Sequence, residues 1–75
     1  MNNKRRTRLK KAKSYIDVAI SIIEMVMGEE EEAFDNFPDS IKDGERGDQM
    51  QDNLDILCNI TDNLETAIDG IDELL

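Results

Sequence analysis

Apolar residues recur along this chain at the spacing of a helix. Two long segments carry them in alternating steps of three and four residues, the pattern of the a and d positions of a coiled coil. The members are Leu9, Ala12, Ile16, Ala19, Ile23 and Val26 in the first segment, and Met50, Leu54, Leu57, Thr61, Leu64, Ile68, Ile71 and Leu75 in the second. Neither segment shows the period of two that a half-buried strand requires. The pattern therefore predicts an all-α protein.

Turn-forming residues separate the two helical segments. Pro38 cannot continue a helix, and the Asp, Asn, Ser and Gly residues around it favour turns and caps. Asp43 is the expected N-cap of the second helix. We expect one domain, residues 1–75, with a basic N-terminal arm at 1–8, a helix at about 5–32, a turn at about 33–45 and a helix at about 46–75. The expected fold is an antiparallel, coiled-coil-like two-helix hairpin.

The first helix is apolar around most of its circumference. Between residues 14 and 28 its polar positions form one narrow stripe, and a second helix cannot cover all the rest. The simplest way to bury it is to pair two hairpins through this helix into a four-helix bundle. The residues expected at this dimer interface are Ile16, Ile20, Ile22, Ile23 and Met27.

Composition argues against an enzyme or a metal protein. The chain has no His and one Cys, so it lacks the residues for His-based acid–base catalysis, a His/Cys zinc site or an internal disulfide. Cys58 lies beside the apolar seam and is expected to be a small buried residue. The acidic turn lacks the spacing of an EF-hand loop. We expect no catalytic residues, no metal and no cofactor.

Charge is divided sharply along the chain. Residues 1–13 carry seven basic residues and no acid, whereas the remaining 62 residues carry all 18 acids against Lys42 and Arg46. Asp17 and Glu24 interrupt the most apolar stretch, so we expect no membrane-spanning segment and a cytoplasmic protein. Asp48, Asp55, Asp62 and Asp69 recur every seven residues and are expected along the outer face of the second helix.

The turn and the second helix carry a resemblance. The run EEEEAFDNFPDSIKDGERGDQM, followed by NLDILCNITDNLETAIDGIDELL, resembles small uncharacterised proteins encoded by phages and conjugative elements of Gram-positive bacteria. These proteins share an acidic run, an F/Y-D-N-x-P-x-S turn, an E-R-G-x-x-M helix start and acidic heptads. The resemblance covers the chain from about Leu9 onward and implies a mobile-element origin, a bacterial host cell and a helical hairpin, with no activity attached.

These features support two hypotheses of function and one structural alternative. In the first, the acidic face docks on a basic protein surface and inhibits an enzyme that handles nucleic acid or serves in defence. Its expected contacts are Asp48, Asp55, Asp62 and Asp69 on the helix, with Glu30, Glu31, Phe34 and Phe37 in the turn. Phe34 and Phe37 have a second interpretation, as packing residues that close the end of the bundle.

The second hypothesis assigns nucleic-acid binding to the basic arm. Its cations would neutralise phosphates without reading sequence. They are Lys4, Arg5, Arg6, Arg8, Lys10 and Lys11. The competing interpretation is that the arm pairs with the acidic end of the second helix. The structural alternative is a purely structural oligomerisation element without a partner.

Overall fold

The computed structural model describes all 75 residues and contains three helices and no strand. Helix α1 spans Asn3–Asp35, the short helix α2 spans Asp39–Lys42, and α3 spans Glu45–Leu74. The prediction of an all-α chain is confirmed. No helix combines the length and the apolar character needed to cross a membrane.

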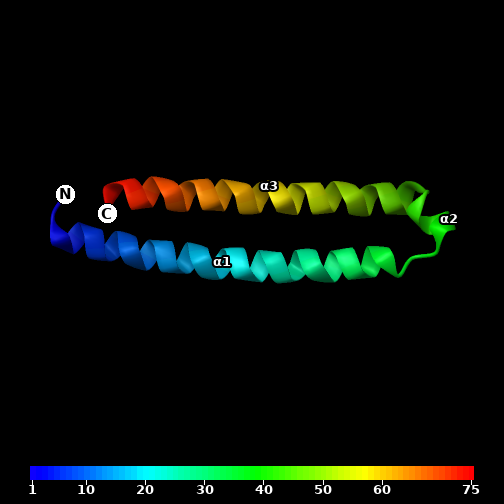
Figure 1. Cartoon of the computed structure of the whole chain (residues 1–75), viewed down its shortest axis with the longest axis horizontal. Helices are drawn as coiled ribbons and strands as arrows, with labels where there is room; N and C mark the ends of the chain where they lie inside the picture. Colours follow the sequence, from blue (N-terminus) through cyan, green and yellow to red (C-terminus); the bar gives the residue numbers. More distant parts are fainter.

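The two long helices, α1 and α3, lie side by side and run in opposite directions (Figure 1). Both chain ends therefore lie at one end of the molecule, and α2 lies at the other. The molecule measures 58 × 15 × 11 Å along its principal axes, so it is a rod two helices wide. We refer to α1 and α3 together as the helix pair.

Helix α1 is longer at both ends than the sequence pattern indicates. It begins at Asn3, so most of the basic arm at 1–8 is part of the helix. The Asn2 side chain caps this end, since its Oδ1 accepts a hydrogen bond from the Arg5 backbone N–H at 2.9 Å. The helix then continues through Gly28 and the glutamates to Asp35.

The connection at residues 33–45 is more helical than expected. Pro38 stands at the N-cap of α2, where the lack of a backbone N–H costs nothing. The prediction that Asp43 caps α3 is wrong, because the N-cap is Gly44 and no side chain bonds to this helix end. The backbone N–H of Asp43 instead closes α2 by donating to the carbonyl of Asp39 at 3.0 Å.

Gly47 lets α2 approach the first turn of α3 closely. It is one of three buried residues in the chain. A Cβ atom at this position would overlap the backbone carbonyl group of Lys42, at the end of α2. The glycine of the E-R-G-x-x-M segment is therefore required by the space between two backbones.

The interior of the helix pair is thin. Ile20 is the only buried apolar side chain, and Thr61 is the only buried polar one. The Thr61 hydroxyl donates to the Leu57 carbonyl at 3.2 Å and lies 3.8 Å from the Met27 sulfur of the opposite helix. Most other seam residues stay half-buried, because two helices alone enclose little volume.

Candidate interaction surfaces

The predicted aspartate row lies on the surface of α3. Asp48, Asp55, Asp62 and Asp69 are all exposed, and their seven-residue repeat places successive carboxylates about 10.5 Å apart along the helix. None of the four makes an ion pair. The row is therefore a line of free negative charge along one side of the molecule.

Helix α1 carries a second acidic row that the sequence analysis missed. Asp17 and Glu24 of its polar stripe are followed at the same seven-residue spacing by Glu31, and all three are exposed. Glu31 lines the same depression as Asp55 of α3, and Asp17 and Asp69 both lie near enough to Lys13 to influence its pKa. The two rows thus lie on one side of the helix pair. Glu24 and Asp62 lie between the pair Glu31 and Asp55 at one end and the pair Asp17 and Asp69 at the other. We call this surface, made of both rows, the acidic side.

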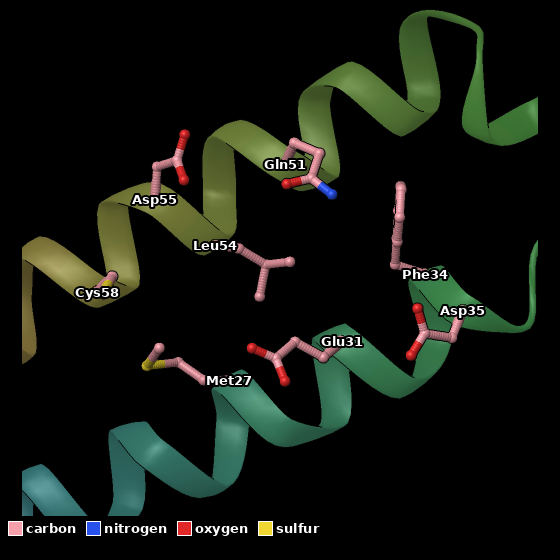
Figure 2. Close-up of a pocket in the computed structure, with 8 residues that line it drawn as sticks. All are labelled: Met27, Glu31, Phe34, Asp35, Gln51, Leu54, Asp55 and Cys58. Atoms are coloured by element: carbon pink, nitrogen blue, oxygen red, sulfur yellow. The ribbon is translucent and has the colours of Figure 1, made fainter.

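A depression with acidic and apolar lining lies on the acidic side near the connection. Met27, Phe34 and Leu54 supply its apolar part, while Glu31, Asp35 and Asp55 supply carboxylates. Figure 2 shows the Leu54 and Met27 side chains between the two helices, with Glu31 beside them and Phe34 toward the connection. An arginine or lysine fits such a surface, because its aliphatic stem contacts apolar groups while its charge meets carboxylates.

Cys58 is exposed and lines the same depression. The prediction that it is buried is wrong. The seam of α3 passes through Leu57 and Thr61, which turns the intervening Cys58 to the flank of the helix. The sequence could not fix its exposure, because a residue next to an apolar seam is covered only where a neighbour reaches over it.

Phe34 and Phe37 are half-buried at the connection rather than fully exposed. The Lys42 ammonium lies 5.6 Å from the centroid of the Phe34 ring, and the Arg46 guanidinium lies 5.5 Å from that of Phe37. These distances suit cation–π contacts. The only two cations outside the N-terminal segment therefore cover the only two phenylalanines, which ties α1, α2 and α3 together at this end.

Glu30 and Glu31, predicted to act together, lie on different sides of the helix pair. Glu31 is on the acidic side, whereas Glu30 lines a depression with Val26 of α1 and Asn53, Ile56 and Leu57 of α3. Consecutive residues on a helix point about 100° apart, so the acidic run does not form one patch.

The basic residues of the N-terminal segment are spread around α1. Lys4, Arg5, Arg8, Lys10 and Lys11 are exposed and Arg6 is half-buried, all on a helix whose successive residues diverge by about 100°. None of these six makes an ion pair, so the interpretation that the basic segment pairs with the acidic end of α3 is confirmed only at Lys13. The sole ion pair of the molecule joins the next cation, Lys13, to Asp72, with Nζ 2.6 Å from Oδ1.

The Lys13 ammonium also donates a hydrogen bond to Asp72 in this ion pair. The hydrogen bond raises the pKa of Lys13 above its ordinary value, and the nearby charges of Asp17 and Asp69 act in the same direction. The two residues lie far apart in sequence and both keep a third or more of their side chains exposed. The pair fixes which part of α1 lies beside the C-terminal end of α3.

The residues predicted at a dimer interface lie mostly between α1 and α3. Ile20 is buried, and Ile16, Ile23 and Met27 are half-buried on the seam facing α3, so only Ile22 points outward. The seam follows Met27 rather than Val26, which is 41% exposed. The apolar side chains left on the outside of α1 are Tyr15, Val18, Ile22, Met25 and Val26, which the sequence analysis did not separate from the seam.

No group of three or more His, Cys, Asp or Glu side chains is arranged to hold a metal ion. Comparison of the chain with protein-family models, with curated proteins and with solved structures finds no match. Function must therefore be argued from the surfaces described above.

Proposed function

We propose that this protein is a non-enzymatic interaction module of a mobile element whose acidic side docks on a basic protein surface. The observation that carries the proposal is the pair of acidic rows, one on each long helix, on the same side of a rod. A basic groove that binds nucleic acid presents the complementary charge pattern, so the target class is an enzyme of nucleic-acid handling or defence, which the module inhibits. The site of action is the cytoplasm of a bacterial host.

The depression at Glu31 and Asp55 supplies the specific contact in this proposal. Repeated carboxylates steer a basic partner toward the surface, but exposed ion pairs add little affinity. An apolar floor flanked by carboxylates adds contact area for one inserted arginine or lysine. Phe34 contributes its ring to this floor, while Phe37 serves in packing.

Within the proposal the chain acts as a coiled-coil-like hairpin, and two hairpins pair into a four-helix bundle. The exposed apolar side chains of α1 support this pairing, since a thin two-helix interior is a weak basis for a stable fold. The acidic sides face outward in such a bundle and remain free for a partner.

The test is affinity capture from a nuclease-treated lysate of a Gram-positive host, eluted with a salt gradient. We expect a basic, nucleic-acid-handling protein that is released at moderate salt, because the contact is electrostatic. The double variant Asp55→Lys/Asp62→Lys should abolish capture. The matched control Glu45→Lys/Asp52→Lys makes the same change in net charge at exposed positions off the acidic side and should retain it.

Two results would contradict the proposal. Equal loss of capture by both double variants would mean that only total charge matters. Capture of nucleic acid alone, from lysate without nuclease and dependent on residues 1–8, would favour the alternative of nucleic-acid binding through the exposed cations of α1.

A further inference from the structure

One side of the helix pair, opposite in character to the acidic side, is apolar on both helices. Val26 of α1 and Ile56 of α3 line one depression there, which shows that both helices contribute to this side. Steps of three and four residues extend the row from Val26 back through Ile22, Ala19 and Tyr15, and from Ile56 forward to Ile60. On α3 the row then continues every seven residues, at Ala67 and Leu74, with Asn63 and Gly70 at the intervening positions. The exposed fractions are 65% for Tyr15, 56% for Ile22, 41% for Val26, 56% for Ile56, 39% for Ile60 and 49% for Leu74. We call this surface the apolar side.

The row on α1 is bounded by opposite charges. Arg8 continues it toward the N-terminus, and Glu30, which lines the depression with Val26, bounds it at the other end. Ala19 lies midway, separated from Arg8 and Glu30 by the same number of residues. A helix with this layout is complementary to itself when reversed, since each Arg8 then meets a Glu30.

On α3 Ile56 has no such counterpart, but one pair of apolar residues is symmetric about Ala67. Ile60 and Leu74 lie equally far before and after it. Two contacts between the helices, Lys13 with Asp72 and Met27 with Thr61, show that Ala19 and Ala67 lie at nearly the same height along the rod. The two smallest apolar side chains of this side therefore lie next to each other on different helices, one midway between Arg8 and Glu30 and the other midway between Ile60 and Leu74.

We propose that the apolar side binds the same side of a second copy, with a two-fold axis that crosses both long helices at right angles, at the height of Ala19 and Ala67. This rests on the bundle of the proposed function and specifies its interface and direction. In this arrangement α1 lies antiparallel on α1 of the second copy, Arg8 faces Glu30 of that copy, and Ile60 faces its Leu74. The alanines allow the helices to approach closely at the axis.

A parallel arrangement of the two α1 helices fits this layout less well. It would set Arg8 against Arg8 and Glu30 against Glu30 at the edges of an apolar contact, where like charges repel. The antiparallel arrangement also leaves both acidic sides pointing away from the interface. A second copy is thus the occupant whose apolar character and charge layout match the apolar side.

The first test compares Ile22→Glu with Ser21→Glu by sedimentation equilibrium. Both positions are exposed on α1, but Ser21 lies in the polar stripe away from the apolar side. Ile22→Glu should raise the dimer dissociation constant at least about 100-fold, because two charges enter an apolar contact. Ser21→Glu should leave it unchanged. Equal masses for Ile22→Glu and the unmodified chain at every concentration would overturn the interface.

The second test reverses charges and measures direction. Arg8→Glu alone and Glu30→Arg alone should each weaken the dimer about tenfold, since each replaces two attractive pairs by repulsive ones. The double variant Arg8→Glu/Glu30→Arg should restore the dissociation constant. The control pair Lys10→Glu/Glu32→Arg, also exposed on α1, should change nothing, singly or together. A double variant no tighter than either single one would overturn the antiparallel arrangement.

A cross-link locates the axis. In a Cys58→Ser background, which removes the exposed native thiol, Ala19→Cys should form a disulfide-linked dimer under mild oxidation, because the two-fold axis places both positions within disulfide reach. Tyr15→Cys in that background should not cross-link. A cross-link at Tyr15→Cys and none at Ala19→Cys would overturn the proposed alignment of the two α1 helices.

These outcomes separate the two proposals. A dimer without charge rescue overturns this inference alone, whereas a purely monomeric unmodified chain overturns the pairing and leaves docking to be judged by capture. The docking proposal alone is overturned if the chain dimerises as described but Asp55→Lys/Asp62→Lys and Glu45→Lys/Asp52→Lys capture the partner equally.

Discussion

Substituting alanine for each helical glycine tests how closely α2 approaches α3. A Cβ at Gly47 would come within 3.0 Å of three backbone atoms of Lys42, and backbone cannot rotate aside as a flexible side chain can. A Cβ at Gly28 or Gly70 would meet nothing within 4 Å. The same chemical change is therefore made in a crowded position and in two open ones.

The magnitudes have opposite signs. In an open helical position alanine is more favourable than glycine by about 1 kcal/mol, so Gly28→Ala and Gly70→Ala should each stabilise the protein by about that amount. At Gly47 the same gain is outweighed by overpacking, which costs about 1–3 kcal/mol, or more where backbone must move. We expect a net loss of up to about 2 kcal/mol for Gly47→Ala, or more if the backbone of Lys42 must move.

The assay is thermal unfolding followed by helical circular dichroism at one fixed protein concentration, because self-association makes the midpoint depend on concentration. For a domain of this size a change of 1 kcal/mol moves the midpoint by about 4–8 °C, so the variants should separate clearly. A Gly47→Ala protein as stable as Gly28→Ala would refute the close approach of α2. It would also remove the physical reason for glycine in the E-R-G-x-x-M segment.

Three further predictions follow from the core and the charges. Ile20→Asp should abolish helicity at micromolar concentration, because an unpaired charge in the only buried apolar position costs several kcal/mol, and a folded Ile20→Asp chain would show that the seam is misplaced. Lys13→Met should destabilise the protein below pH 10.5, and the difference should shrink as pH rises past the raised pKa of Lys13, where the unmodified chain loses its charge pair; a difference constant up to pH 12 would contradict this. Added salt should raise the midpoint of unfolding by screening repulsion between the acidic rows, and a midpoint that falls with salt would mean that attraction dominates.

Sequence periodicity predicted the helical character of the chain but not which apolar residues face α3. The difficulty lies in pairs such as Ile22 and Ile23 or Val26 and Met27, where two adjacent apolar residues fit two different frames of the same repeat. A helix that is apolar over most of its circumference offers several such frames, and only the position of the neighbouring helix selects one. The structure selects Ile20, Ile23 and Met27 for the seam and leaves Ile22 and Val26 outside.

The acidic side was half visible in the sequence. The aspartates of α3 were recognised from their seven-residue repeat. On α1, Asp17 and Glu24 were seen only as part of a polar stripe and Glu31 only as a residue of the turn. That the two rows share one side depends on how the helices align, which Lys13 and Asp72 report and which one-dimensional spacing does not contain. Similarly, α2 is a single turn of helix whose formation depends on packing against α3, so local propensity could not specify it.

The thin interior of the helix pair has a consequence for the amount of protein in a cell. A chain with one buried apolar side chain opens often, and in its open form it is a substrate for proteases. Whatever binds the folded rod withdraws it from that fate in proportion to its own concentration. Under the docking proposal, the supply of folded rod would then follow the supply of binding partner, and copies made in excess would be open to degradation.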